Sequence, residues 1–216
     1  MKYDIGIIGG GIVGAATFYK IQKAFPSLKV ILFEKEERLA SHQTGNNSGV
    51  IHSGLYYKPG SLKAKNCVSG RHELVKFSKD YNVKHDVCGK VVVATHKSEF
   101  KFMDQIYENG IANNTEGIEK IDQQAIKDIE PHVEGIGGIW VPCTGIVDFV
   151  GATNKMAEVA LGINSASKLA LSEEAISFDH KQDYTIIRTN KGQYEVKNLI
   201  FCGGLQADRL AKKDGV

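Results

Sequence analysis

The stretch YDIGIIGGGIVG, residues 3–14, decides the fold of this chain. Residues 3–9 predict a buried strand, and residues 12–25 continue with the spacing of a helix. Between them stands a G-x-G-x-x-G pattern, made of Gly9, Gly11 and Gly14. In such a unit the first glycine makes a tight turn, the second lets a pyrophosphate approach the backbone, and the third lets the helix pack on the strand. The stretch therefore predicts an α/β fold with a dinucleotide-binding site.

A carboxylate follows at the distance that a dinucleotide-binding domain requires. Residues 29–35 predict a second strand, and Glu34 stands near its end, twenty residues after Gly14. There a carboxylate accepts hydrogen bonds from the adenosine ribose, and it would repel the additional phosphate of NADP. The alternative is an ordinary tight turn and a surface glutamate, which the combined spacing disfavours. Glu34 does not distinguish NAD from FAD.

The next segment, HQTGNNSGVIHSG at residues 42–54, favours FAD. An NAD domain would continue towards a helix and a third parallel strand, whereas this chain enters a loop rich in glycine and amides. In two-domain FAD enzymes a loop of this kind crosses the pyrophosphate and passes beside the isoalloxazine ring. Gly45 and Gly49 would permit that approach. The predicted donors to phosphate or flavin atoms are Thr44, Asn46, Asn47 and Ser48.

Composition is that of an ordinary globular protein. The 216 residues are 42% hydrophobic and 24% charged, and the formal net charge of +2 is too small to indicate nucleic-acid binding. Four cysteines stand far apart, which favours free thiols in a reducing compartment. The sequence has no run of eighteen apolar residues and no visible signal or transit peptide. We expect a soluble, cytoplasmic chain.

Short apolar runs alternate with helix-length amphipathic segments along the chain, which is typical of α/β architecture. After the first strand–helix–strand unit, helices are predicted at 61–81, 98–112 and 122–130 and from residue 151. Strands are predicted at 89–96, 117–121, 135–147, 175–181, 183–190, 193–197 and 198–204, with a hairpin at residues 190–192. The chain stops just after a further helix begins, so we expect a fragment.

Five segments carry a family resemblance: MKYDIGIIGGGIVG, LFEKEERLASHQTGNNSGVIHSGLYYKPGSLKAKNCVSG, CGKVVVAT, PCTGIVD and LIFCGGLQADRL. Together they resemble the L-2-hydroxyglutarate dehydrogenase/oxidase family, part of the D-amino-acid-oxidase-like group of FAD enzymes. The resemblance implies oxidation of L-2-hydroxyglutarate to 2-oxoglutarate. Because members are roughly twice as long, it covers their N-terminal half only.

The resemblance also implies a domain organisation and a set of cofactor-binding residues. A Rossmann-like FAD-binding domain of the GR2/DAO-like type, residues 1–82 and 148–216, would be interleaved with part of an α+β substrate domain, residues 83–147. The implied FAD-binding residues are Gly9, Gly11, Gly14, Glu34, Lys35, Thr44, Asn46, Asn47, Ser48, Gly49, Val50, Ala175, Gly203 and Gly204.

Oxidation of a 2-hydroxy acid requires a hydride acceptor, a base and cations for the carboxylates. His52 is our candidate base; the alternative is that it only hydrogen-bonds the flavin or the backbone. Tyr56 or Tyr57 could contact a substrate oxygen, and the predicted catalytic set is His52, Tyr57 and Lys90. Lys90 is the favoured carboxylate clamp because it opens a strand of the predicted substrate domain. No metal site is predicted.

Two other functions remain open from the sequence. One is a related FAD enzyme acting on glycerol 3-phosphate or an amino acid, and the other is a non-catalytic FAD- or ADP-binding module. The expected electron acceptor is oxygen, a quinone or an electron-transfer chain, and the sequence does not choose among them. The resemblance is compatible with peripheral association at the inner membrane.

Overall fold

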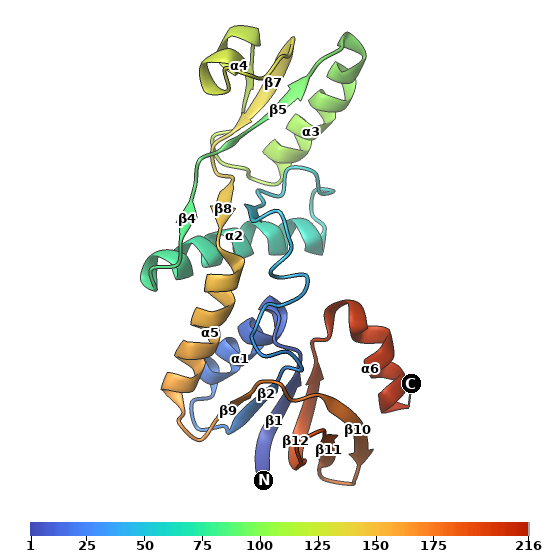
Figure 1. The fold of residues 1–216 in the computed structure, drawn as a ribbon. Helices are drawn as coiled ribbons and strands as arrows, with labels where there is room; N and C mark the ends of the chain where they lie inside the picture. Colours follow the sequence, from blue (N-terminus) through green and yellow to red (C-terminus); the bar gives the residue numbers. More distant parts are fainter. Residues whose placement is uncertain (216) are drawn as a thin grey trace. The chain divides into compact units, whose positions relative to one another are not determined.

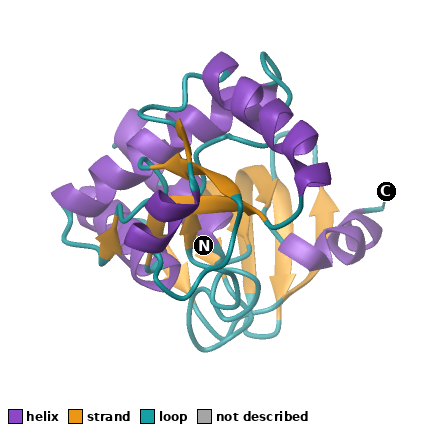
Figure 2. Ribbon diagram, turned by 90° about the horizontal axis from the view of Figure 1, so that it is seen from above, coloured by secondary structure: helices purple, strands orange, loops and turns teal. Residues whose placement is uncertain are grey.

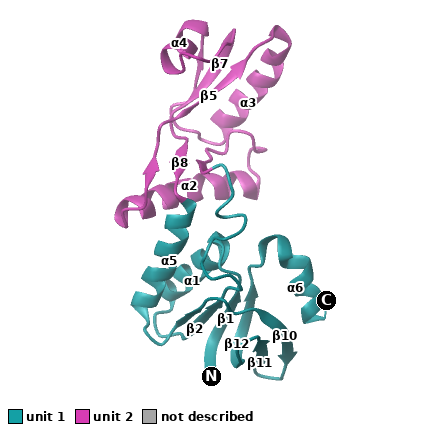
Figure 3. Ribbon diagram, viewed as in Figure 1, with its two compact units in different colours: residues 1–48, 149–216 teal, residues 49–148 magenta. Residues whose placement is uncertain are grey.

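The computed structural model describes residues 1–215. They form two compact units, and the chain leaves the first unit and returns to it (Figure 3). Unit 1 comprises Met1–Ser48 and Phe149–Val216, and unit 2 comprises Gly49–Asp148. Residues 49–82, which the sequence assigns to the cofactor domain, lie in unit 2. Which unit binds cofactor and which binds substrate stays a prediction.

Unit 1 is built on a six-stranded sheet (Figure 1). Its parallel strands are β1 (Lys2–Ile8), β2 (Val30–Phe33), β9 (Lys168–Ala170) and β12 (Gln193–Phe201). β10 (Ala175–His180) and β11 (Thr185–Thr189) extend it antiparallel, in the order β10-β11-β12-β1-β2-β9. The third parallel strand beside β2 therefore exists, but the chain supplies it only after unit 2.

The two faces of this sheet bury separate apolar clusters. Successive side chains of a strand point to opposite faces, so Ile7 and Ile8 join different clusters. Ile7 packs with α1 (Ile12–Ala24) and α5 (Phe149–Ile163), which lie side by side in Figure 1. Ile8 belongs to the cluster that includes Leu210 of α6 (Ala207–Asp214), a helix that follows the short η2 (Gly204–Gln206) and lies beside the strands in Figure 2. The sheet is thus covered on both faces.

Unit 2 contains two small sheets and three α-helices. One sheet has the order β3-β8-β4, and the other has the order β5-β7-β6. Met103 and Ile106 of α3 pack on Ile139 and Val141 of β7 in one buried cluster. The bounds are β3 (Val50–Ile51), α2 (Leu62–Asp80), β4 (His85–Asp86), β5 (Lys90–Ala94), η1 (Lys97–Glu99), α3 (Phe100–Ala112), β6 (Glu119–Ile121), α4 (Gln123–Ile129), β7 (Gly137–Val141) and β8 (Gly145–Val147).

The predicted α/β fold class is confirmed, with differences in the short strands. Residues 193–197 and 198–204, predicted as two strands, form the single strand β12 with an end at Phe201, because no turn residue separates them. The structure also has β3, β4 and β9, which were not predicted. Each is only two or three residues long, so its periodicity cannot be recognised, and long-range pairing creates it.

The fingerprint glycines allow α1 to begin directly at the end of β1. Gly9 has φ +114°, a conformation that favours glycine. A Cβ atom at Gly14 would overlap the carbonyl oxygen of Gly9, so the helix can approach the strand end only without a side chain there.

We expect Gly14→Ala to destabilise the protein by roughly 1–3 kcal/mol, because overpacking outweighs the gain in helix propensity. Gly162 offers a matched control, since it also lies in a helix and a Cβ there would meet nothing within 4 Å. Gly162→Ala should be neutral or slightly stabilising. Urea unfolding followed by circular dichroism measures both, and equal midpoints would contradict the close-packing argument.

Candidate functional site

In unit 1, several predicted residues meet at the carboxyl ends of the parallel strands. Gly9 follows β1, Glu34 follows β2, and Gly203 follows β12 by two residues. The amide of Gly9 donates to the carbonyl of Phe33 (2.9 Å), and the amide of Cys202 donates to that of Ile8 (2.7 Å). Ligands of open α/β sheets bind at this edge, outside the carboxyl ends of the strands.

The N-terminus of α1 presents backbone rather than side chains. Its N-cap residue is Gly11, which has no side chain to accept from the first-turn amides. Thr44 supplies one acceptor from outside, because its Oγ1 receives the amide of Ile12 at 3.0 Å. The first turn of a helix has no intrahelical acceptors for its amides and carries the positive end of the dipole, so it attracts anions. This arrangement suits a phosphate group.

Glu34 is held by the backbone around it. Its Oε2 accepts from the amide of Gly10 at 2.7 Å, and its Oε1 accepts from the amide of Glu36 at 3.0 Å. Each carboxylate oxygen can accept a second hydrogen bond. Both oxygens therefore keep capacity for hydroxyl donors such as those of a ribose.

The polar loop after β2 is attached to the glycine turn. The amide of Ala40 donates to the carbonyl of Gly10 at 3.0 Å. Asn46 donates its side-chain amide to the carbonyl of His42 (2.7 Å), and Asn47 donates to that of Thr44 (2.6 Å). The amides expected to meet a ligand therefore make contacts that brace the loop itself. Ser48 is exposed at the end of the loop.

The remaining predicted cofactor residues lie in different surroundings. Ala175 is buried at the start of β10, and its carbonyl accepts from Lys213 Nζ at 3.0 Å. Gly204 has φ +55°, and a Cβ there would meet nothing within 4 Å. Lys35 stands 3.6 Å from the Glu36 carboxylate. Gly49 and Val50 belong to unit 2, where β3 pairs with β8.

In unit 2, the structure brings His52 and Lys90 into one electrostatic environment. Partial burial lowers the pKa of His52, and the Lys90 ammonium lowers it further. Lys90 opens β5, where its ammonium lies 4.5 Å from the ring centroid of Tyr56 and donates to the Tyr56 hydroxyl at 3.4 Å. Lys90 thus contacts Tyr56 and acts electrostatically on His52, and we call these three residues the His52 cluster.

Tyr57, the predicted catalytic tyrosine, does not share the partners of its neighbour Tyr56. The ammonium of Lys63 lies 4.7 Å from its ring centroid, and its carbonyl accepts from Asn113 Nδ2 at 2.8 Å. Sequence reasoning placed Tyr57 in the catalytic set and left Tyr56 outside it. The contact between Tyr56 and Lys90 spans 34 residues, so no local pattern could have indicated it.

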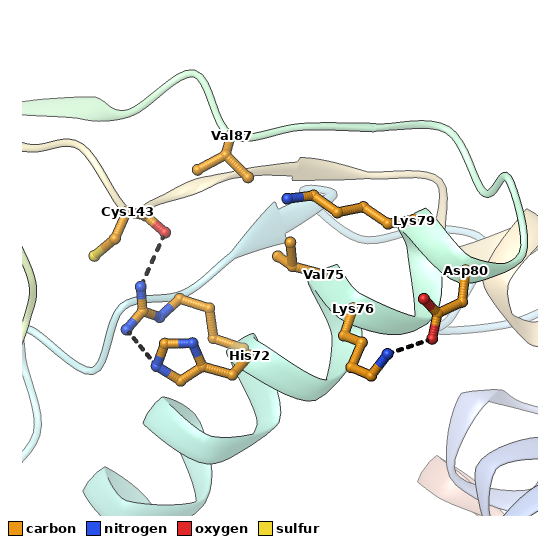
Figure 4. Close-up of a pocket in the computed structure, with 8 residues that line it drawn as sticks. His72, Val75, Lys76, Lys79, Asp80, Val87 and Cys143 are labelled. Carbon is orange, nitrogen blue, oxygen red and sulfur yellow. Dashed lines mark hydrogen bonds and ion pairs between the residues drawn. The ribbon is translucent and has the colours of Figure 1, made fainter.

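A basic pocket of about 530 Å³ lies along α2 (Figure 4). Its charges are largely compensated: Arg71 pairs with Glu116, and Lys76 pairs with Asp80 at 2.8 Å. Burial raises the pKa of the Cys143 thiol in its wall, which keeps that thiol protonated. The pocket is lined by Arg71, His72, Val75, Lys76, Lys79, Asp80, Val87 and Cys143. Among residues 1–215, no group of three or more His, Cys, Asp or Glu could hold a metal ion.

Residues 4–216 match the model of the family described as DAO, FAD dependent oxidoreductase. The chain belongs to this family. It is 46% identical to L-2-hydroxyglutarate dehydrogenase of Indibacter alkaliphilus over 98% of the chain and 53% of that protein. It is 42% identical to the mitochondrial L-2-hydroxyglutarate dehydrogenase of Caenorhabditis elegans over 99% of the chain and 50% of that protein. The chain thus spans about half the length of the curated relatives it matches.

Solved structures of DAO-family proteins share the fold. Dithionite-reduced L-alpha-glycerophosphate oxidase from Mycoplasma pneumoniae with FAD bound matches the whole chain with a TM-score of 0.91 and 26% identity, over 57% of its own length. Glycine oxidase from Geobacillus kaustophilus matches with a TM-score of 0.86 and 18% identity, over 59% of its own length, and shows the fold alone. The predicted family resemblance is confirmed.

FAD is the cofactor of the DAO family, and unit 1 fits the ADP part of it. The first turn of α1, whose N-cap Gly11 has no capping side chain and whose Ile12 amide alone is engaged by Thr44, suits the pyrophosphate, and the free lone pairs of Glu34 suit the ribose. A Cβ at Gly11 would approach only Thr44 Oγ1, at 3.2 Å, so this glycine leaves the backbone accessible. Among the described residues, no helix is long and apolar enough to cross a membrane.

We expect Thr44→Val to release the Ile12 amide, because a methyl group of similar size replaces the accepting hydroxyl. A hydrogen bond of about 1 kcal/mol corresponds to a rise of roughly fivefold in the hydrogen-exchange rate of that amide. Thr44→Ser keeps the hydroxyl and should exchange as the wild type does. Exchange measured by NMR that is equally slow in the Val and Ser variants would contradict the anchoring role of Thr44.

Proposed function

We propose that this chain is part of an FAD-dependent enzyme that oxidises L-2-hydroxyglutarate to 2-oxoglutarate. The observation that carries the proposal is the 46% identity, over 98% of the chain, to a protein named L-2-hydroxyglutarate dehydrogenase. The His52 cluster supports it, because it combines a basic side chain with an ammonium group.

In this proposal unit 1 holds the ADP part of FAD. The amides at the start of α1 receive the pyrophosphate, and Glu34 accepts from the ribose. The loop from Thr44 to Ser48 contributes its backbone, since two of its side-chain amides brace the loop. The other predicted contacts are made by Gly49, Val50, Ala175, Gly203 and Gly204.

Oxidation of the alcohol removes a hydride from carbon 2 and a proton from its hydroxyl group. When bound, FAD supplies the hydride acceptor. We assign the proton to His52 Nε2 or Nδ1, because a histidine with a lowered pKa is unprotonated at neutral pH and can accept it. Lys90 would bind a carboxylate of the substrate, and the Tyr57 hydroxyl is a further proposed contact to a substrate oxygen.

The direct test begins with the purified 216-residue chain mixed with FAD. We expect a yellow protein whose flavin absorption bleaches on anaerobic addition of L-2-hydroxyglutarate. In parallel, this chain is grafted in place of the matching residues of the Indibacter alkaliphilus relative. Bleaching of the graft by sn-glycerol 3-phosphate or an amino acid, with no response to L-2-hydroxyglutarate, would refute the substrate. Absence of FAD from both proteins would refute cofactor binding.

We expect His52→Ala in the graft to slow flavin reduction by L-2-hydroxyglutarate roughly 10²- to 10⁴-fold, the usual contribution of a general base. FAD should remain bound, because the residues proposed to hold its ADP part lie in unit 1. His132→Ala, at another exposed histidine of unit 2, is the control. Stopped-flow reduction rates measure both variants, and an unchanged rate in His52→Ala would remove the base role.

For the electron acceptor, the family resemblance leaves oxygen and a quinone or electron-transfer chain. Turnover in air with formation of hydrogen peroxide would select oxygen. Turnover only with an added quinone analogue would select a quinone or an electron-transfer chain. Co-sedimentation with liposomes would then test peripheral membrane association.

A further inference from the structure

Lys90 has an aromatic partner, whereas several other cations of unit 2 have an acidic one. Lys76, Lys120 and Lys127 each pair with a carboxylate. Within residues 1–215 no acidic side chain pairs with Lys90, which is half-buried and contacts the ring and hydroxyl of Tyr56. An aromatic ring attracts an ammonium group without cancelling its charge. Lys90 is therefore both held in place and electrostatically unsatisfied.

The other groups around His52 do not compensate this charge. From α2, the Cys67 thiol donates to the carbonyl of His52 at 3.4 Å. Burial raises the pKa of that thiol, while the charges of Arg71 and Lys90 act on it in the opposite direction. From the same loop as His52, Tyr56 contacts Lys90 through its ring and its hydroxyl. Among residues 1–215, no acidic group is a cause of the pKa shift of His52 or Cys67, which favours an incoming anion.

We propose that Tyr56 is a positioning residue that holds the Lys90 ammonium as the carboxylate-binding group of the His52 cluster. The ligand class is a small dicarboxylate, and the inference rests on the proposed function for the identity of the substrate. Tyr56 acts through Lys90 and takes no part in proton transfer. The bound carboxylate places its negative charge beside the imidazole.

The pair formed by Lys63 and Tyr57 provides a matched control. It has the same residue types and a similar separation, 4.7 Å against 4.5 Å from ammonium to ring centroid. Lys63 is exposed and is not among the causes that shift the pKa of His52. Loss of the Lys63 charge should therefore leave the pKa of His52 unchanged, both in the free protein and with a bound carboxylate.

The test uses the 216-residue chain without FAD and glutarate as a redox-inert probe. The imidazole signal of His52, assigned by its loss in His52→Gln, is titrated by NMR with and without glutarate. In the wild type, glutarate should raise the pKa of His52, because a carboxylate offsets the charge of Lys90. Lys90→Met should raise the pKa without glutarate and weaken glutarate binding at least tenfold, and Lys63→Met should change neither.

Variants of Tyr56 test the positioning role itself. Tyr56→Leu removes ring and hydroxyl and should weaken glutarate binding roughly three- to tenfold, the range expected for loss of a cation–π contact. Tyr56→Phe keeps the ring and should retain most of the affinity, which also controls for folding. A wild type that does not respond to glutarate overturns the proposal. So does an equal response in Lys90→Met, or wild-type affinity in Tyr56→Leu.

A kinetic measurement separates this inference from the proposed function. In the graft, Tyr56→Leu should raise the KM for L-2-hydroxyglutarate three- to tenfold with a smaller change in kcat. If the wild-type graft oxidises no L-2-hydroxyglutarate while the NMR responses are as expected, the proposed substrate is wrong and the dicarboxylate site stands. If the graft is active and Tyr56→Leu changes neither the affinity for glutarate nor the KM for L-2-hydroxyglutarate, the positioning role is wrong.

Discussion

The close approach of α1 to the end of β1 is the constraint on which the edge of unit 1 depends. Because Gly9 and Gly14 carry no side chains, the helix begins where the strand ends. The turn between them then offers its own polar groups as anchors. The amide of Gly10 binds Glu34, and its carbonyl receives Ala40. The ribose-binding candidate and the following loop are thus both positioned by the backbone of one residue of the turn, Gly10.

Sequence reasoning succeeded where the deciding contacts are local. The glycine pattern and Glu34 fall within one strand–helix–strand unit, so their spacing alone indicates where they meet. β9 could not be predicted, because it consists of three residues and pairs with β2 only after all of unit 2 has intervened. The loop after Glu34 is polar and glycine-rich, and its contact with the flavin stays a prediction. What the sequence could not show is that Asn46 and Asn47 direct their amides to carbonyls of the loop itself.

In unit 2 the limit of prediction is the pairing of side chains that are distant in the sequence. Tyr56 and Tyr57 are adjacent and chemically identical, yet Tyr56 contacts Lys90 and Tyr57 contacts Lys63. Nothing in the sequence distinguishes the two tyrosines, because the distinction arises from where β5 begins. Arg71 and Glu116 are likewise 45 residues apart, and only the fold shows that this buried guanidinium is already compensated.

The nature of each cation's partner decides what that cation can do. A carboxylate partner compensates the charge of Arg71, whereas the aromatic partner of Lys90 contacts the ammonium without cancelling its charge. The positive charge of Lys90 has two effects: it attracts an anion, and it lowers the pKa of His52. Oxidation of a hydroxy acid needs both a cation for the carboxylate and an unprotonated base. Under the proposed function, the Lys90 charge favours both conditions in the unliganded protein, and a tyrosine partner preserves that charge whereas an acidic partner would cancel it.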